Sequence, residues 1–463
     1  MATANKVTQR SRTSELPGFF RKLRSEHLPT SIFLLAILAI VKLFDDNVVA
    51  TITEQVKNLA AHPQTAVVLA VFPDSTTSVP MLKGLGFLSS DDIPLQDDRQ
   101  WILRRLYEGN TPEATARKIR DEIAKKDQNV VMVVGHERST TAKNLIEQVY
   151  ESDSYVAHGG PIPLILPAVT NPELTQAPRD GQRHILRLPA SDDRQVLDIL
   201  NLIQSFDPAP KAVELVVDNG NREYSNYIAN ALIAQGNKQG LPIVDAVGVD
   251  IFSSGFSPDR FLKSNPDTII FIGMEAEASI FVRRLKEGCQ GKDCQRFDEK
   301  HLRLVFTDGV AGDSFIKTVK SLLTDGESIY ITGPPLEEVH RGSSADIQSI
   351  PSYETYARVA RAIIIDILKR SAQTTHGVTR AAVLRTLQGM LGVTQGRGSP
   401  SFNEYGDNTA ARFHIYEVTR LRCTHSHRCP GDDTSLALAR KLPVGVVGAS
   451  LKTIAREQGA LAF

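Results

Sequence analysis

Uninterrupted apolar runs alternate along this chain with longer stretches in which apolar residues recur every three or four positions. Short apolar runs are typical of strands that are covered on both faces, and the longer periodic stretches are typical of amphipathic helices. The expected strands are residues 66–72, 101–106, 130–134, 164–166, 213–217, 243–249, 268–272 and 302–306. The clearest expected helices are residues 111–126, 353–371 and 380–391. Strand, helix and strand in this rhythm predict βαβ units, and therefore an α/β fold with parallel sheets.

The amino-terminal part of the chain carries a separate apolar run, Ile32 to Val41, which follows a segment with several lysines and arginines. Positive charge before an apolar run keeps that end in the cytoplasm. We therefore expect a basic cytoplasmic segment at 1–30 and a single-pass membrane anchor at 31–52. The run is shorter than the roughly 20 residues of a spanning helix, so two alternatives stay open. These are a signal peptide cleaved after Ala50, which would release a periplasmic or secreted protein, and a buried helix of a cytosolic protein.

The four cysteines form two close pairs in the sequence, Cys289 with Cys294 and Cys423 with Cys429. An even number in local pairs suits an oxidising compartment, and we expect two local disulfides. His425 and His427 lie between the second pair, so a zinc site is the alternative there. Its spacing matches no common zinc-finger pattern, and no metal site is expected.

Charge and motifs exclude several classes of function. The 463 residues include 53 basic and 53 acidic side chains, so the sequence lacks the basic excess of a nucleic-acid binder. It contains no P-loop, no Gly-x-Ser-x-Gly elbow and no His-Glu-x-x-His motif. We therefore expect a protein that is not an enzyme and needs no cofactor.

Two hydroxyl-rich segments follow neighbouring expected strands. The first is Gly135 to Thr141, where a glycine precedes a Ser/Thr cluster, and the second is Pro167 to Thr175, which reads PAVTNPELT. In their order and separation these segments resemble the type I periplasmic substrate-binding proteins, and within them the branched-chain amino-acid (leucine/isoleucine/valine) binding proteins of ABC transporters. The resemblance covers roughly residues 66 to 420.

This resemblance implies a fold of two doubly wound, Rossmann-like lobes joined by a hinge with three crossings. The N-terminal apolar helix would precede the lobes. The implied division is residues 62–184 plus 332–394 for the first lobe, 185–331 plus 395–420 for the second lobe, and 421–463 for a C-terminal tail.

The resemblance also implies a ligand site between the lobes. The residues at the family's ligand positions are Ser139, Thr140, Ala168, Thr170, Tyr224 and Asp308. The first four would bind the carboxylate of an amino acid, Asp308 its ammonium group, and Tyr224 would close over it. Taken singly, each residue also has an ordinary structural role, such as a helix cap for Ser139 or a turn for Asp308.

Two segments depart from the family pattern. Residues 78–100 include Gly84, Gly86, Pro94 and several aspartates, so we do not expect the regular helix of the family there. Arg138 stands beside the hydroxyl cluster and is expected to point outward to Glu137, with a ligand carboxylate as its alternative partner. The ligand specificity is therefore expected to differ from that for branched-chain amino acids.

Together these features predict an extracytoplasmic protein that captures an amino acid or a similar small polar ligand between two lobes. The expected partners are that ligand, the membrane through the N-terminal helix, and the permease and ATPase of an ABC transporter. The alternative is a membrane-anchored sensor that signals through its N-terminal segment.

Overall fold

The computed structural model describes residues 65–95, 101–125, 128–152, 160–176, 183–253, 256–257, 265–287, 302–323, 328–335, 353–374, 378–393, 400–422 and 435–441. Residues 31–52, the expected membrane anchor, and all four cysteines lie outside these ranges. Within the described ranges, no helix is both long and apolar enough to cross a membrane.

The first of two sheets has six strands in the order β2-β3-β1-β4-β5-β6. All neighbours in it are parallel except β2, which runs antiparallel to β3. The strands are β1 (Thr65–Phe72), β2 (Asp92–Pro94), β3 (Trp101–Tyr107), β4 (Gln128–Gly135), β5 (Leu164–Leu166) and β6 (Ile185–Arg187).

Strand β1 explains why the apolar runs are continuous. Its alternate residues Ala66, Val68 and Ala70 belong to one hydrophobic core, and the intervening Val67 and Leu69 belong to another. Successive side chains of a strand point to opposite faces of the sheet, so a strand covered on both sides needs apolar residues throughout.

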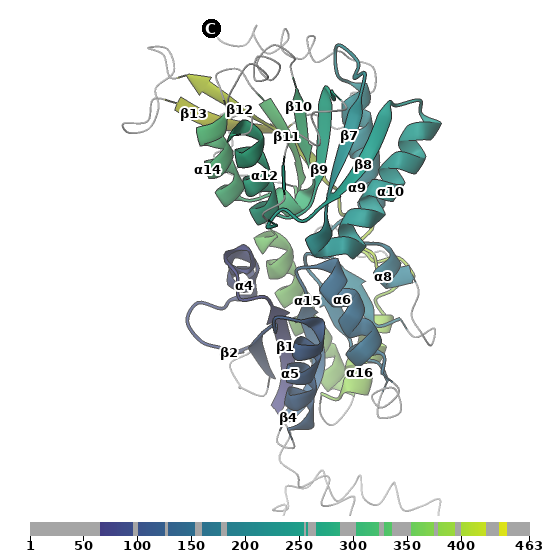
Figure 1. The fold of residues 1–463 in the computed structure, drawn as a ribbon. Coiled ribbons are helices and arrows are strands. Elements are labelled where there is room, and N and C mark those ends of the chain that lie inside the picture. The colour runs from purple at the N-terminus through teal and green to yellow at the C-terminus, as the bar shows by residue number, and fades with distance from the viewer. Residues whose placement is uncertain are drawn as a thin grey trace, which may run out of the picture. The chain divides into compact units, whose positions relative to one another are not determined.

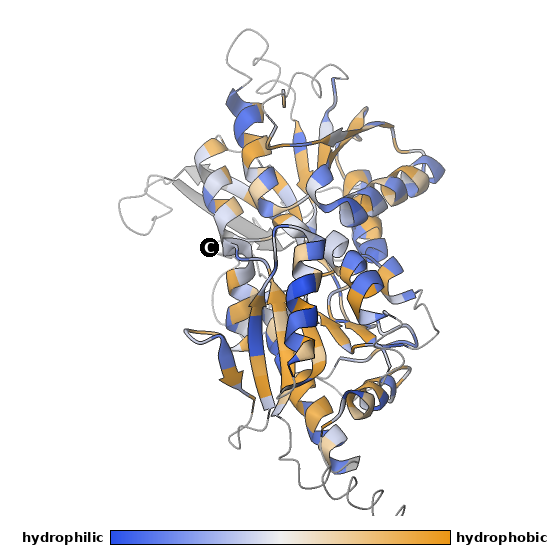
Figure 2. Cartoon of the chain, turned by 60° about the horizontal axis from the view of Figure 1, so that its bottom comes forward, coloured by the Kyte–Doolittle hydropathy of each residue, from blue (hydrophilic) through white to orange (hydrophobic). Residues whose placement is uncertain are grey.

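Helices cover both faces of this sheet (Figure 1). On one side are α5 (Pro112–Ala124) and α6 (Ser139–Leu145), and on the other are α4 (Val79–Leu85), α15 (Glu354–Thr374) and α16 (Arg380–Gln388). A short helix, α8 (Glu173–Gln176), follows β5. Figure 2 shows hydrophobic strands in the middle of this sheet and hydrophilic stripes on the helices that cover it. This sheet and its helices are called lobe 1 below.

The second sheet has seven strands in the order β13-β12-β11-β10-β9-β7-β8. They are β7 (Val213–Asp218), β8 (Ile243–Val249), β9 (Thr268–Ile272), β10 (Arg303–Phe306), β11 (Ser328–Gly333), β12 (His414–Arg422) and β13 (Ser435–Lys441). Strands β7 to β11 are parallel, and β12 and β13 are antiparallel to their neighbours.

Helices also cover both faces of the second sheet. The helices α9 (Asp192–Gln204) and α10 (Arg222–Lys238) pack on one face, and α12 (Glu275–Glu287) and α14 (Asp313–Leu322) on the other (Figure 1). This sheet and its helices are called lobe 2. The eight expected strands are all present, and their bounds differ from the predicted ones by at most two residues.

The expectation for residues 78–100 was wrong in part. A helix, α4, does form there, beginning close to Pro80 and ending at Gly86, whose φ of 99° only glycine adopts readily. Gly84 lets this helix approach α15 closely, because a Cβ on Gly84 would lie 2.4 Å from the Glu354 carbonyl oxygen. The glycines therefore shorten the helix and bring it against α15.

Three connections join the lobes, and two of them lie side by side. Residues 188–191 lead from β6 to α9, and residues 403–413 lead into β12. Arg187 and Asp407 form a parallel bridge between them, and the Asn408 amide donates a hydrogen bond to the Arg187 carbonyl oxygen (3.1 Å). Ala190, Ala411 and Phe413 form a small hydrophobic cluster of their own beside this pair. These two connections therefore form one paired hinge element.

Candidate functional site

The turn after β4 depends on Gly135. Its φ is 144°, and a Cβ at this position would lie 2.1 Å from the Val71 carbonyl oxygen of the neighbouring strand. Only glycine can therefore end β4 in this way, and the turn then carries Glu137 and Arg138 before α6 begins at Ser139.

The hydroxyl cluster on α6 contacts the second lobe. Ser139 is buried as the first residue of the helix, and no side-chain hydrogen bond caps this helix. The Thr140 amide and hydroxyl both donate to the Oδ1 atom of Asn221, at 3.2 and 3.1 Å. The same hydroxyl accepts a hydrogen bond from the Glu223 amide (3.2 Å). Thr140, one of the four residues that the resemblance assigns to a ligand carboxylate, thus binds an amide oxygen of lobe 2.

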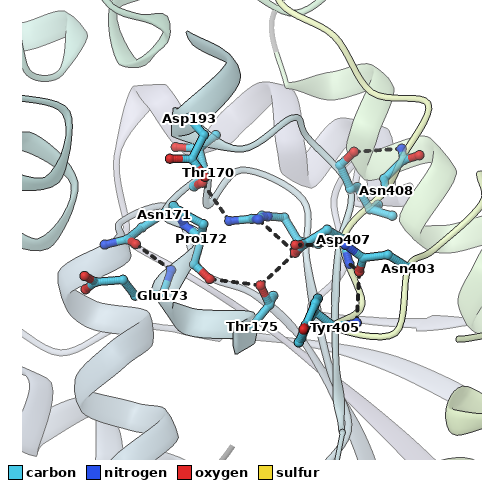
Figure 3. Close-up of polar contacts among 12 residues, drawn as sticks. Thr170, Asn171, Pro172, Glu173, Thr175, Asp193, Asn403, Tyr405, Asp407 and Asn408 are labelled. Carbon is cyan, nitrogen blue, oxygen red and sulfur yellow. Dashed lines mark hydrogen bonds and ion pairs between the residues drawn. The ribbon is translucent and has the colours of Figure 1, made fainter. Parts of the chain in front are cut away.

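The segment after β5 is tied to the hinge. Ala168 and Thr170 are buried, and the Thr170 carbonyl oxygen accepts hydrogen bonds from the Arg187 Nη1 atom (2.7 Å) and the Asp192 amide (3.1 Å). Arg187 is completely buried and forms an ion pair with Asp407 (2.8 Å). Figure 3 shows how Thr170 and Asp407 lie on either side of this junction.

Asp308 is enclosed by hydrogen-bond donors of the protein. It follows β10, is 2% exposed, and its Oδ1 atom accepts from Gln195 Nε2 (2.6 Å) and from the Tyr224 hydroxyl (2.7 Å). Its Oδ2 atom accepts from the Tyr353 hydroxyl at the start of α15. Tyr224 and Asp308 are thus brought into direct contact, within a hydrogen-bond network that already satisfies the carboxylate.

A second buried carboxyl group, Asp192, lies next to this network. Burial raises its pKa, and the nearby charge of Asp308 raises it further. Burial also raises the pKa of Asp308, although its three donors oppose that rise. The three donors to Asp308 favour its charged form, whereas burial and the charge of Asp308 favour the protonated form of Asp192.

A cavity of about 320 Å³ lies at the carboxyl ends of β1, β3 and β4, between residues of both lobes. Lobe 1 contributes the turns after these three strands, and lobe 2 contributes Met274, Ala276 and Glu277 after β9. None of the six residues at the family's ligand positions lines it, although their neighbours Arg138 and Thr141 do. This position, beyond the carboxyl ends of parallel strands, is where α/β sheets bind ligands.

Three glutamates and one arginine supply the charge of the cavity wall. Glu108 Oε1 accepts a hydrogen bond from His136 Nδ1 (2.8 Å), and the other ring nitrogen of His136, Nε2, contacts the Tyr150 hydroxyl (2.9 Å). Glu137 accepts a hydrogen bond from the Ser78 hydroxyl (2.8 Å), and burial raises the pKa of its carboxyl group. Arg138 does not point to Glu137 as expected, because its Nη2 atom lies 3.7 Å from Glu277 Oε1 in lobe 2.

Glu277 and Asp218 are the buried acids on the lobe 2 side. Both are 3% exposed, and neither Glu277 Oε2 nor Asp218 Oδ2 has a hydrogen-bond partner in the described part of the chain. Burial raises the pKa of Asp218 to about 6, and the charge of Glu277 raises it while Arg138 lowers it. The charged groups Arg138, Glu277 and Asp218 therefore lie near one another, where the Arg138 side chain reaches from lobe 1 to lobe 2.

Sequence reasoning missed Glu108, Asn221 and Glu277. Each follows the carboxyl end of an expected strand by a few residues, which is the one signal that marked them. Many other polar residues share that position, so the sequence alone did not single them out.

The alternatives at the cysteines are not addressed by the structure. Cys289, Cys294, Cys423 and Cys429 lie outside the described residues, as do His425 and His427. Among the residues that are described, no cluster of three or more His, Cys, Asp or Glu side chains could hold a metal ion. The local disulfides and the alternative zinc site stay predictions.

Solved structures share this fold at low sequence identity, whereas the sequence matches no protein-family model and no curated protein. A leucine-binding protein from Thermotoga maritima is 15% identical and has a TM-score of 0.55. The aligned region covers 76% of this chain and 95% of that protein. A branched-chain amino-acid ABC transporter protein from Thermus thermophilus with bound valine is 13% identical and has a TM-score of 0.55, and the aligned region covers 83% of this chain and 98% of that protein. A type 1 periplasmic binding protein from Bordetella pertussis is 13% identical and has a TM-score of 0.56, and the aligned region covers 82% of this chain and 100% of that protein. The chain has the fold of the type I periplasmic binding proteins, as the resemblance in its sequence predicted.

Proposed function

We propose that this protein is an extracytoplasmic binding protein that captures an amino acid or a similar small polar ligand between its two lobes. The observation that carries this proposal is a cavity of about 320 Å³ whose wall comes from both lobes. Ligand pockets of about 300–1,000 Å³ are typical of small-molecule sites. A ligand that touches both walls favours the closed arrangement of the lobes, which is how binding would be coupled to closure.

The contact between Thr140 and Asn221 supports a specific role for the hydroxyl cluster. Asn221 Oδ1 accepts from both the amide and the hydroxyl of Thr140. A carboxylate oxygen is a stronger acceptor of the same geometry. We therefore keep Ser139, Thr140, Ala168 and Thr170 as the proposed carboxylate site, in which a ligand replaces Asn221. Because protein donors already surround Asp308, we assign it the role of orienting Tyr224 beside the ligand.

The proposed use of this binding event is delivery to the permease and ATPase of an ABC transporter. The Thermus thermophilus and Thermotoga maritima proteins of the same fold are described as an amino-acid ABC transporter protein and a leucine-binding protein. The first of these structures contains bound valine and the second protein is named for binding leucine, which supports a role without catalysis. Signalling through residues 1–60 is the alternative, and it requires that the N-terminal segment stays in the mature protein.

Calorimetric titration of the full chain with each of the common amino acids tests the proposal. The protein is first unfolded and refolded to remove any ligand that copurifies, and that ligand is identified by mass spectrometry. We expect saturable binding of one ligand per chain, and recovery of that ligand unchanged. Chemical conversion of the ligand would instead identify an enzyme. Intact mass of the mature protein distinguishes a retained anchor from a cleaved signal peptide.

A further inference from the structure

The wall of the cavity carries more negative than positive charge. Glu108, Glu137 and Glu277 line it, and Arg138 is the only basic residue among its lining residues. Glu137 and Glu277 come from different lobes, after β4 and after β9. We call these two residues the acidic pair. A ligand held between the lobes would lie within reach of both.

Glu277 shows that the acidic pair is more than a solvated acidic surface. Its side chain is 97% buried, and its Oε2 atom has no hydrogen-bond partner among the described residues. Its Oε1 atom lies 3.7 Å from the Arg138 guanidinium, which exceeds an ordinary hydrogen-bond length. A buried carboxylate oxygen without a donor is costly, so this atom requires a positively charged or donating group.

Glu137 lines the cavity on the lobe 1 side and, unlike Glu277 Oε2, it has hydrogen-bond donors. Its carboxyl group is buried, and its donors are hydroxyl groups, Ser78 at 2.8 Å being one of them. Burial raises its pKa, and the neighbouring charge of Glu108 raises it further. Arg138 is thus shared among several carboxyl groups, and it cannot neutralise all of them.

We propose that the ligand is a small organic cation, such as a basic amino acid, whose positive side chain lies between Glu137 and Glu277. This inference rests on the proposed function and names its ligand class. Placing an ammonium or guanidinium group between the acidic pair supplies donors to the free Glu277 oxygen and balances the charge of both lobes. The same group would hold the lobes together, because it bridges a carboxylate of each.

Calorimetry with L-arginine and L-citrulline tests this proposal on the full chain. The two amino acids have nearly the same shape, but the side chain of citrulline is neutral. We expect arginine to bind at least tenfold more tightly than citrulline. Glu277→Gln and Glu137→Gln should each reduce that preference at least fivefold while keeping the size of the side chain. The exposed Glu287, on the same helix as Glu277, provides the matched control Glu287→Gln, which should keep the preference.

The outcomes separate this inference from the proposed function. Binding of citrulline or leucine as tight as that of arginine would overturn the cationic ligand and leave an amino-acid binding protein. Absence of binding by both charged and neutral amino acids would overturn the proposed function itself. If Glu277→Gln does not fold by circular dichroism, Glu137→Gln decides the matter, and an unchanged preference in that variant refutes the role of the acidic pair.

Discussion

The Tyr353 hydroxyl donates a hydrogen bond to the Asp308 carboxylate, and this bond joins the two lobes. Tyr353 precedes α15 of lobe 1, and Asp308 follows β10 of lobe 2. Gln195 and Tyr224, both from lobe 2, donate to the other carboxylate oxygen. Any movement that separates the lobes at this point has to break the bond from Tyr353.

Removing that hydroxyl is therefore expected to destabilise the protein and loosen the contact between the lobes. Tyr353→Phe should lower the free energy of unfolding by about 1.5–3 kcal/mol, the usual value for a hydrogen bond to a charged group. Urea denaturation measures this change. Tyr356 is the matched control, because it lies three residues later, in the first turn of α15, and no hydrogen bond of its hydroxyl is found among the described residues. An equal loss in Tyr356→Phe would contradict a specific role of the bond.

The contact between Thr140 and Asn221 is expected to be a true energetic coupling. A double-mutant cycle with Thr140→Val and Asn221→Ala should give an interaction energy of about 0.5–3 kcal/mol, because two hydrogen bonds join the residues directly. The cycle is measured by urea denaturation without ligand. If the proposed carboxylate site is correct, saturating ligand should reduce this coupling, since the ligand then replaces Asn221.

The ion pair between Lys143 and Glu223 is the comparison for that cycle. It joins α6 to the first turn of α10, directly after Asn221, at 2.8 Å, but its side chains are 38% and 31% exposed. Exposed ion pairs typically contribute only about 0.2–1 kcal/mol, so the coupling should be smaller than that of Thr140 and Asn221. A larger value for the ion pair would show that the lobes are held mainly by surface charge.

The fold was predictable from the sequence because the parallel strands are covered on both faces and therefore continuously apolar. Strands β2, β6, β11, β12 and β13 were not predicted. The sequence of β12, HIYEVTRLR, mixes polar and apolar residues near the antiparallel edge, and β2 and β6 have only three residues each. Strand β11 is buried like the predicted strands, but serine, threonine and glycine leave it only a short apolar run, SIYITG. The strand ends could be predicted as the place of the site, and the cavity lies there. The residues that face it could not, because Glu277 and Arg138 meet only through the approach of two lobes.

Asp218 is expected to make stability depend on pH. Its pKa is raised from 3.8 to about 6, mainly by burial, so folding favours its protonated form. The cost of the buried charge is absent below about pH 4, grows as the pH rises toward 6, and persists above it. The melting temperature of Asp218→Asn minus that of the unaltered protein should therefore increase from pH 4 to pH 7. An asparagine keeps the acceptor for the Gly220 amide.

The same sign is expected at an independent position. Burial also raises the pKa of Asp198, on α9, to about 6. Asp198→Asn should therefore show a melting-temperature difference that rises over the same pH range. If the melting temperature of either variant, minus that of the unaltered protein, falls as the pH rises, the pKa of that aspartate is not raised by folding.

Gly135 is expected to tolerate no side chain. Gly135→Ala would combine an unfavourable φ of 144° with a Cβ that lies 2.1 Å from the Val71 carbonyl oxygen. We expect this variant to be destabilised by more than about 3 kcal/mol or to fail to fold, because backbone atoms have to move. Gly240→Ala is the control, with a positive φ of 73° but no atom within 4 Å, and should lose only about 1 kcal/mol.

Arg187 is expected to be the most costly charged residue to remove from the hinge. It is completely buried, pairs with Asp407 at 2.8 Å and donates to the Thr170 carbonyl oxygen at 2.7 Å. Arg187→Met leaves both partners without their cation, which for a buried pair typically costs about 3–5 kcal/mol in the free energy of unfolding.

A matched surface pair and a second substitution separate the causes of that loss. Arg370→Met removes an exposed ion pair to Asp366 of the same length, 2.8 Å, and should cost at most about 1 kcal/mol. Adding Asp407→Leu to Arg187→Met removes the abandoned charge as well. This double variant should regain part of the stability, because the penalty of the single variant comes largely from the unpaired carboxylate. A double variant that is less stable than Arg187→Met would instead assign the loss to the hydrogen bonds that Asp407 accepts from Thr175 and Asn403.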